Sequence, residues 1–170
     1  MYQKFYEQEQ GEAEMDSKEI MKKCKEEANW TMKRGMGGPF GAAIIKDGEM
    51  ISLASNVVLK DHDPTAHAEI TAIRLAGKVL KTHDLSGCEL YTTAQPCPMC
   101  LSAAIWANIK KIHYGCSAAD ADNIGFRDKF IYDFIEGKCQ DTSVLELEQV
   151  ERESCLELFQ EYHENNRQMY

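Results

Sequence analysis

Two short stretches of the sequence combine residue types that could do chemistry together. Cys97 and Cys100 lie three positions apart in QPCPMC, and His67 and Glu69 lie two positions apart in PTAHAE. A CxxC pair alone can be a redox pair, half of a metal site or two small core residues, and a lone histidine at a helix start is more often structural than a ligand. Together, the stretches supply one imidazole, two thiolates and one carboxylate, and this combination favours a metal centre.

The donor set indicates zinc in a catalytic site. Zn²⁺ prefers four tetrahedral ligands from cysteine sulfur and histidine nitrogen, and a catalytic site supplies three of them and leaves the fourth position to water. We predict His67, Cys97 and Cys100 as the three protein ligands, because the sequence has no second CxxC and no HxxxH to complete a structural site. Both stretches lie at predicted helix N-termini, where the positive end of the helix dipole favours thiolates over thiols.

Glu69 is the predicted proton carrier of this site. Residues two apart face different ways in mid-helix, so His67 and Glu69 can share a pocket only at the mouth of a helix, for which Pro64 is suitably placed. A carboxylate beside activated water, but not on the metal, can accept the proton of that water and pass it on. The HxE stretch followed by PCxxC is identified as the signature of zinc nucleobase deaminases, whose reaction needs this proton transfer.

The surrounding segments predict the elements that position these residues. Apolar spacing predicts a helix capped by Ser17, a helix from near His67 and a helix over 97–107. Strands are predicted in AAIIK and EMISLAS, which flank the hairpin pair Asp47-Gly48, and in ELYTT and KKIHYG. The tail adds an amphipathic helix in GFRDKFIYDFIEG, a possible fifth strand in VLELEQV and a last helix in ERESCLELFQEYHENN. This order indicates an α/β fold, a three-layer α/β/α sandwich with a central five-stranded mixed sheet, parallel later strands and helices on both faces.

The composition of the whole chain limits the class of protein. Its 170 residues suit one domain, with a polar arm over residues 1–16 and a single domain over 17–170. The net charge of −9 repels phosphate backbones, and no apolar run reaches the roughly 18 residues that span a bilayer. We therefore expect neither a nucleic-acid nor a membrane partner. The N-terminus lacks the apolar core of a secretion signal, so we expect a cytoplasmic protein.

The seven cysteines are odd in number, which argues against a disulfide framework and for reduced thiols. Apart from the two predicted ligands, each cysteine stands alone among apolar neighbours, and we predict that these five are small buried hydrophobic residues without a function: Cys24, Cys88, Cys116, Cys139 and Cys155.

The sequence resembles the cytidine-deaminase-like fold, and within it most closely the bacterial guanine deaminases. The resemblance is carried by GGPFGAAIIKDG, SNVV, DPTAHAEITAIR and YTTAQPCPMC, and it reaches GFRDKFIYDFI. The HAE and PCPMC stretches are shared by the whole superfamily, whereas DADNIGFRDKFIY is similar to the guanine deaminases in particular. The resemblance implies one zinc ion per subunit and conversion of guanine and water to xanthine and ammonia. Guanosine, or cytosine or another small aminated heterocycle, is the alternative substrate, and a tRNA adenosine deaminase or a non-catalytic zinc domain is a further alternative.

The resemblance also implies which residues hold the purine. Asn56, Asp120 and Tyr170 match the family's asparagine before the HAE helix, its acidic residue after the fourth strand and its C-terminal tyrosine. Asn56 offers both a donor and an acceptor, and an ionised Asp120 can accept ring N–H protons. Phe40 could stack on the base, and Ala68, inside the HAE stretch, completes the predicted substrate contacts. From the residues alone, Asn56 could equally be a loop residue and Asp120 a helix cap.

The same resemblance implies a homodimer whose C-terminal segment, residues 137–170, is swapped and closes an active site, often that of the partner. Gln95 is the main departure from the family, which commonly has glutamate before PCPMC. Gln95 keeps a similar shape but removes a negative charge near two thiolates, so metal binding should be retained. Its effect on local hydrogen bonding and on substrate choice is open.

Overall fold

The computed structural model describes residues 15–165 and 169, in a chain that divides into two compact units, residues 1–126 and 127–170. The first unit holds a sheet of four strands among the described residues, in the order β2-β1-β3-β4. The strands are β1 (Gly41–Lys46), β2 (Glu49–Ser55), β3 (Cys88–Ala94) and β4 (Lys111–Cys116). All four arise where the sequence predicts them.

The first two strands form the predicted hairpin. Asp47 and Gly48 connect β1 to β2 with φ values of 51° and 80°, which is the backbone that an Asp-Gly turn adopts most readily. β1 also pairs antiparallel with β3, whereas β3 and β4 are parallel. The sheet is therefore mixed, with a parallel pair at the β3–β4 edge as predicted.

The fifth predicted strand is wrong. Residues 144–150, the stretch VLELEQV, form no strand in the structure, and their side chains are exposed. Alternating apolar and acidic residues favour a strand only where a neighbouring strand and a core can accept them, because a lone strand leaves its backbone groups unpaired. The second unit contains no strand within its described residues, so this alternation has nothing to pair with there.

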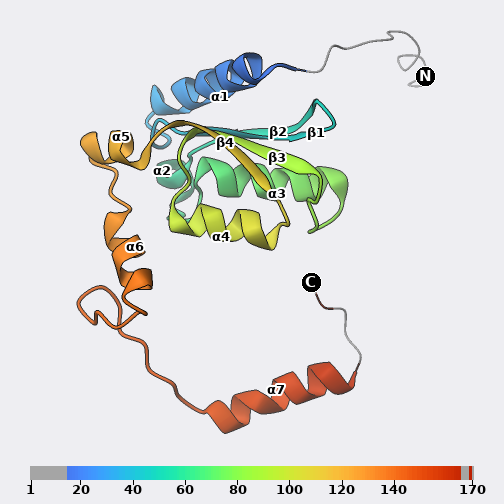
Figure 1. Cartoon of the computed structure of the whole chain (residues 1–170), viewed down its shortest axis with the longest axis vertical. Coiled ribbons are helices and arrows are strands. Elements are labelled where there is room, and N and C mark those ends of the chain that lie inside the picture. The colour runs from blue at the N-terminus through green and yellow to red at the C-terminus, as the bar shows by residue number, and fades with distance from the viewer. Residues whose placement is uncertain (1–14, 166–168, 170) are drawn as a thin grey trace. The chain divides into compact units, whose positions relative to one another are not determined.

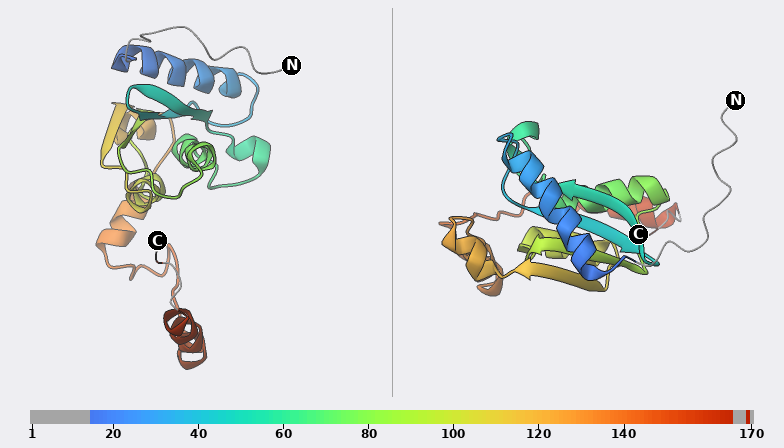
Figure 2. Two further views of the ribbon diagram at one scale, coloured as in Figure 1. Left: turned by 90° about the vertical axis from the view of Figure 1, so that its right-hand side faces the viewer. Right: turned by 90° about the horizontal axis from the view of Figure 1, so that it is seen from above.

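Helices cover both faces of the sheet, as predicted (Figures 1 and 2). On one face α1 (Ser17–Met32) packs Ile20 and Cys24 against Ala43, Ile45 and Tyr91 of the sheet. On the other face α3 (Ala68–Leu80) and α4 (Pro98–Trp106) lie over the apolar side of the same strands. This second core layer is built mostly from small residues and includes Ala42, Ile44, Ala68, Ala72, Ala76, Leu90 and Ala104. Small side chains allow the helices to approach the strands closely, which brings the two helix starts together.

The remaining helices include two short ones that the sequence did not predict, α2 (Val58–Asp61) and α5 (Ala118–Asn123). The second unit contains the two predicted tail helices, α6 (Lys129–Glu136) and α7 (Arg152–Glu164). The predicted cap of α1 is wrong by one residue. Asp16, not Ser17, is the N-cap, and its carboxylate accepts the Glu19 N–H at 2.8 Å.

All seven cysteines are free thiols. Cys24 and Cys88 are buried as predicted, but Cys116 and Cys155 are exposed and Cys139 is half-buried. The prediction failed because apolar neighbours in sequence do not place a residue on the covered face of its element: Cys116 ends the edge strand β4, and α7 has no buried residue in the chain alone. None of the helices in the described part of the chain is long and apolar enough to cross a membrane.

Candidate metal centre and active site

Two helix starts place the predicted zinc ligands. His67 is the N-cap of α3 and Cys97 is the N-cap of α4, both with extended backbone (φ −67°, ψ 156° and φ −68°, ψ 169°). Pro98 follows at the first helical position of α4, where its fixed φ suits the helix and its missing N–H costs no hydrogen bond. Cys100 then lies one turn into α4. The side chains thus converge at the positive ends of two neighbouring helices, which stabilises thiolates.

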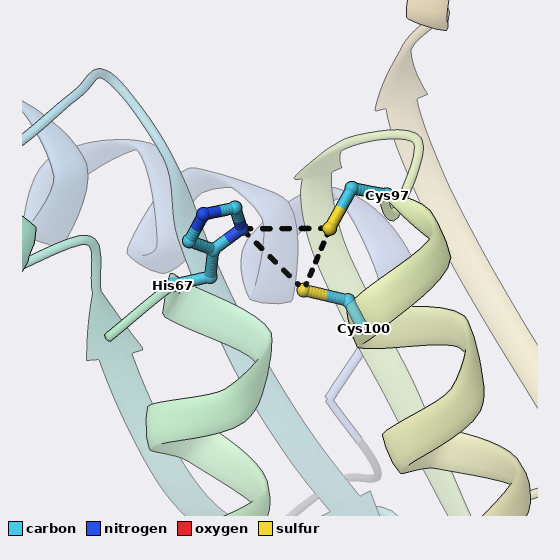
Figure 3. Close-up of side chains that lie close together, drawn as sticks. All are labelled: His67, Cys97 and Cys100. Carbon is cyan, nitrogen blue, oxygen red and sulfur yellow. Dashed lines mark hydrogen bonds between the residues drawn. The ribbon is translucent and has the colours of Figure 1, made fainter. Parts of the chain in front are cut away.

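The three predicted ligands point toward one another (Figure 3). His67 Nδ1 lies 3.6 Å from the Sγ atoms of both Cys97 and Cys100, and the two Sγ atoms are 3.5 Å apart. A tetrahedral zinc ion with Zn–S of about 2.3 Å and Zn–N of about 2.0 Å needs S···S near 3.8 Å and S···N near 3.5 Å. The donor atoms therefore already have the spacing of three zinc ligands to within a few tenths of an ångström.

The two thiols of this cluster differ in acidity. Hydrogen bonding with Cys100 lowers the pKa of Cys97 to about 4, with a further contribution from His67, although burial opposes the shift. The same hydrogen bond, together with burial, raises the pKa of Cys100. Two thiolates this close in a buried site repel each other, so the protein alone favours one charge. A divalent cation between the sulfurs removes that restriction, which is the behaviour of a metal site.

Glu69 lies beside the cluster on the first turn of α3, as the sequence predicts for a helix mouth. Its side chain is only 5% exposed. Its Oε2 accepts a hydrogen bond from Cys100 Sγ at 3.5 Å, and its Oε1 accepts one from the Thr92 hydroxyl at 3.0 Å. Burial raises the pKa of Glu69, while its own backbone N–H and Thr92 lower it. A carboxyl in this environment takes up a proton more readily than an exposed glutamate does, which suits a group that accepts a proton and returns it.

A hydrogen-bonded turn over residues 63–67 positions His67 next to the two cysteines. Asp63 Oδ1 accepts from the Thr65 N–H at 2.8 Å and from the Thr65 hydroxyl at 2.7 Å, and the His67 N–H donates to the Thr65 carbonyl at 2.8 Å. These Thr65 hydrogen bonds hold the pKa of Asp63 below its ordinary value. Arg74, in the middle of α3, places its Nη1 atom 3.6 Å from Oδ2 of Asp63. The ion pair between Asp63 and Arg74 therefore connects the turn around Pro64 to α3, the helix that follows it.

Asn56 is a buried residue whose amide orientation is fixed by the backbone. Its Oδ1 accepts N–H bonds from Gly38 at 3.2 Å and from Val58 at 3.3 Å. The Val57 N–H bonds to the Ala66 carbonyl at 3.1 Å, which holds this loop next to the residue before His67. Because Oδ1 is occupied, the amide presents its N–H₂ group as a donor, rather than both a donor and an acceptor.

The other predicted substrate residues lie in different settings. Asp120 is exposed and forms a capping box at the start of α5, in which Ser117 is the N-cap and the Asp120 carboxylate accepts the Ser117 N–H at 2.8 Å. Phe40 meets Phe126 edge to face at 4.8 Å between ring centroids. Ala68 is fully buried, so its methyl group belongs to the core and only its main chain is at the helix start. Tyr170 lies outside the described residues.

Phe40 and Asp120 do share a cavity of about 770 Å³. It is bounded by α1 and by the C-terminal ends of β3 and β4, and its lining also includes Thr93, Cys116 and Ile124. His67, Glu69, Cys97 and Cys100 are not among the lining residues. The structure therefore brings the three ligands and Glu69 together at the starts of α3 and α4. It holds Asn56 in the loop that bonds to Ala66, and it places Phe40 and Asp120 around a different hollow.

Gln95 connects the end of β3 to the start of α5. Its side-chain Oε1 accepts the Ala118 N–H at 3.3 Å, and its backbone N–H donates to the Cys116 carbonyl at 2.8 Å. Its amide is therefore engaged with the helix that carries Asp120.

Thr92 was missed from the sequence. It is completely buried, and it shares with Leu90 the face of β3 that packs against α3. A signal existed in the period-2 pattern of the strand, because a hydroxyl stands at a position where the neighbours two residues away, Leu90 and Ala94, are apolar. A buried hydroxyl needs a partner, and its partner here is Glu69.

The chain is similar to several proteins that are named as deaminases. It is 49% identical over 110 residues to the guanine deaminase of Bacillus subtilis (strain 168), a match that spans 65% of this chain and 70% of that protein. The crystal structure of a Bacillus subtilis guanine deaminase superposes with a TM-score of 0.84 at 41% identity, over 92% of this chain and 99% of that one. The tRNA-specific adenosine deaminase of Aquifex aeolicus (strain VF5) is 48% identical over 87 residues, 51% of this chain and 56% of that protein.

The family model that matches is the cytidine and deoxycytidylate deaminase zinc-binding region, over residues 14–116. This range includes α1, the whole sheet, and the two helix starts with His67, Glu69, Cys97 and Cys100. The cluster geometry, the adjacent buried carboxylate and the sequence match agree. The chain belongs to the zinc-binding deaminase family defined by that region.

Proposed function

We propose that this protein is a zinc-dependent hydrolytic deaminase that converts guanine and water to xanthine and ammonia. The triangle of His67, Cys97 and Cys100 donor atoms, with the Glu69 carboxyl beside it, carries the proposal of hydrolytic deamination. Guanine is supported as the substrate by the similarity to the Bacillus subtilis guanine deaminase, which extends over most of both chains in the structural comparison.

The three ligands would hold one zinc ion, and the spacing of their donor atoms fits it. When bound, zinc lowers the pKa of a water molecule toward about 7 and so supplies the nucleophile. Glu69 accepts the proton of that water through Oε2, the oxygen that faces Cys100. It then donates the proton to the amino nitrogen of the substrate. A C–O bond forms at the ring carbon, its C–N bond breaks, and ammonia leaves. The second proton of the water ends on the adjacent ring nitrogen, which gives the carbonyl group of xanthine.

Several side chains are proposed to hold the base. Asn56 donates its N–H₂ group to an acceptor on the purine, since Oδ1 is engaged by the backbone. Hydrogen bonds from Ser117 lower the pKa of Asp120, which keeps it ionised to accept purine N–H protons. Phe40 supplies an aromatic surface, and Ala68 contributes through its main-chain N–H at the helix start, which has no intrahelical partner.

Ammonia release tests the reaction and its substrate. Purified, zinc-loaded protein should release ammonia from guanine faster than from guanosine, cytosine or adenine, and xanthine should form in equal amount. Turnover of guanosine or cytosine without turnover of guanine would replace the substrate but keep the chemistry. Release from none of these compounds would contradict the proposed activity.

Glu69→Gln tests the proton carrier. The variant keeps the size of the side chain but cannot accept and return a proton, so kcat should fall by about 10² to 10⁴. Zinc content, measured by atomic absorption, should stay at one ion per chain, because Glu69 is not a ligand. Retained activity would assign the proton transfer to another group. Loss of zinc would place Glu69 on the metal.

Deamination of adenosine in tRNA is the second candidate, favoured by the similarity to the Aquifex aeolicus enzyme. The net charge of −9 opposes it, because RNA binding depends on neutralising phosphates. A gel-shift titration with tRNA at low salt, with inosine formation measured in parallel, separates the two. Inosine formation in tRNA without xanthine formation from guanine would select this second function.

We also propose a homodimer in which residues 137–170 are exchanged between subunits. The support is the character of α7, whose thirteen residues include Leu156, Leu158, Phe159 and Tyr162 with at least 36% of each side chain exposed. Apolar residues along a helix that buries none of them in the single chain favour a partner surface. A cytoplasmic location is supported by the seven free thiols, which need a reducing compartment.

A further inference from the structure

The hydrogen bond between Thr92 and Glu69 joins two of the most enclosed polar side chains of the protein. Thr92 is 0% exposed and Glu69 is 5% exposed. The Thr92 hydroxyl donates to Oε1 of Glu69 at 3.0 Å. The two residues are 23 positions apart in sequence and come from different layers, Thr92 from the sheet and Glu69 from the helix above it.

The two oxygens of the Glu69 carboxyl have different neighbours. Oε1 is bound to Thr92, whereas Oε2 lies 3.5 Å from Cys100 Sγ and so faces the ligand cluster. A glutamate side chain has a broad terminal torsion and can present either oxygen. The Thr92 hydroxyl favours one of these two orientations, because rotation of the carboxyl away from the observed orientation would break a buried hydrogen bond.

Thr92 is itself held rigidly. It lies inside β3, where its neighbours in register are Ala42 of β1 and Tyr114 of β4, so strands flank it on both sides. As a β-branched residue it also has a restricted χ1 torsion. The Thr92 hydroxyl is therefore held in one position by the sheet, whereas the longer side chain of Glu69 on the first turn of α3 is less restricted.

We propose that Thr92 is a positioning residue for the reaction: its hydroxyl holds Oε1 of Glu69 so that Oε2 is presented to the water and the amino group. The Thr92 hydroxyl bonds to Glu69, and Thr92 acts on the reaction through that carboxyl. The inference rests on the proposed function, in which Glu69 carries the proton. It goes further by naming the group that orients this carboxyl, and it assigns separate roles to the two oxygens.

Three variants of the full-length, zinc-loaded protein test the proposal. Thr92→Val keeps the shape of the side chain and removes the hydroxyl, and Thr92→Ser keeps the hydroxyl. Ser52→Ala is the matched control, because Ser52 is a buried hydroxyl on β2 that also bonds to α3, at the Ala72 carbonyl 2.8 Å away, and does not contact Glu69. For Thr92→Val, kcat should fall about tenfold or more, with KM within about twofold and one zinc ion per chain.

Thr92→Ser should keep kcat within about threefold of the wild type, and Ser52→Ala should lower the unfolding midpoint without lowering kcat. Unchanged kcat in Thr92→Val would overturn the proposal. So would an equal loss in Thr92→Ser, or a loss that appears only in KM or in zinc content. The same kcat loss in Ser52→Ala would reduce the effect to general destabilisation.

Crystal structures of the zinc-loaded wild type and Thr92→Val give a readout that does not depend on activity. The wild type should show Oε1 within hydrogen-bond distance of the Thr92 hydroxyl, and the variant should show a rotated or disordered carboxyl. An identical, ordered carboxyl in both would overturn the positioning role even if the protein is active. A rotated carboxyl in a protein that deaminates no substrate would keep the positioning of Glu69 and refute the proposed function alone.

Discussion

The side-chain amide of Gln95 bonds to the helix that carries a proposed substrate residue. Its Oε1 accepts the first N–H of α5, and α5 carries Asp120, the proposed acceptor for the purine. The Ser117–Asp120 capping box fixes the carboxylate relative to that helix start. Gln95 therefore joins the end of β3, just before the zinc ligands, to the residue proposed to select the base.

Substitution of Gln95 should change KM more than kcat. Gln95→Leu leaves the Ala118 N–H without its partner, which costs about 1 kcal/mol at a half-buried position, so KM for guanine should rise severalfold. Gln95→Glu still offers an oxygen to that N–H, so its KM should stay within about threefold of the wild type. Steady-state kinetics with zinc analysis measures both. If Gln95→Leu has the KM of the wild type, this amide does not position α5 for substrate.

The chemistry of single residues could be predicted from the sequence only where type and spacing restrict it. Cys97 and Cys100 on one helix turn, with an imidazole and a carboxylate elsewhere, are compatible with few sites. Thr92 carries no such restriction, since threonine is common in strands and the partner of its hydroxyl depends on how the helix layer lies over the sheet. The orientation of the Asn56 amide could not be predicted either, because its partners are backbone N–H groups that come close only in the folded loop.

At the scale of elements, the loop between α1 and β1 determines where Asn56 lies. A Cβ atom on Gly37 would overlap the main-chain oxygen and the Oδ1 of Asn56. The next residue, Gly38, donates its N–H to the same Oδ1. The loop can therefore approach Asn56 only because residue 37 lacks a side chain.

Gly37→Ala should displace Asn56 and impair substrate binding. We expect kcat/KM for guanine to fall at least about tenfold, equivalent to about 1.4 kcal/mol, with zinc content unchanged. Gly35→Ala is the control in the same loop. A Cβ there meets no atom within 4 Å, and the cost is limited to backbone strain at φ 65°, about 1–2 kcal/mol of stability. Equal kinetic losses in the two variants would mean that loop strain, not the contact with Asn56, affects activity.

The edge of the sheet opposite β2 has a charge cluster with a pH dependence of its own. Glu89 is on β3, and its two partners are on β4. Its Oε2 lies 2.7 Å from His113 Nε2, and its Oε1 lies 3.1 Å from Lys111 Nζ. The His113 ring also stacks on Tyr91 at 4.1 Å between centroids. The hydrogen bond with His113, and then that with Lys111, lowers the pKa of Glu89 below its ordinary value of 4.5.

Because the pKa of Glu89 is lower in the folded state, its contribution to stability is present above pH 4.5 and is lost as the pH falls through the folded-state pKa. Glu89→Gln should lower the free energy of unfolding at pH 7 by a few tenths to about 1 kcal/mol, the range of partly exposed pairs. This difference from the wild type should shrink toward zero as the pH falls through the folded-state pKa of Glu89. Urea unfolding at several pH values measures it, with Glu26→Gln on the exposed face of α1 as control. A difference independent of pH would exclude this ionisation as its source.

The sequence predicted the long elements better than the short ones. The hairpin, the parallel β3–β4 pair and the two ligand helices depend on local signals that burial in one core reinforces. α2 has four residues and α5 has six, and helices this short do not show a recognisable helical spacing of apolar residues in the sequence. The stretch VLELEQV has a strand pattern but lies in a unit without a sheet, and only the fold of the whole chain decides that.

At the scale of the whole molecule, the question is which subunit the C-terminal segment serves. The chain divides into two compact units, and α7 in the second unit exposes Leu158 at 67% and Phe159 at 73%. Isolated helices of this length are marginal in water, so α7 needs a surface to pack against. A second copy of the chain is the partner proposed above, and in the proposed exchange Tyr170 would close the active site of that partner.

Complementation between two inactive variants tests this exchange. Glu69→Gln removes the proton carrier and Tyr170→Ala removes the tyrosine, so each homodimer should be inactive or strongly impaired. After unfolding, mixing and refolding with zinc, half of the dimers are mixed. If Tyr170 serves the partner, the subunit with intact Glu69 receives Tyr170 from the Glu69→Gln chain, and each mixed dimer has one complete site. Activity should then return to about a quarter of the wild-type level per chain, as expected for a symmetric dimer.

If Tyr170 serves its own subunit, no mixed dimer has a complete site, and the mixture should be no more active than its components. Light scattering measures the molar mass of the wild type in solution. A monomeric mass would exclude the exchange of segments between subunits. Wild-type protein taken through the same refolding is the control for recovery. Rescue therefore requires both a dimer and a tyrosine that crosses between subunits, and neither condition alone can produce it.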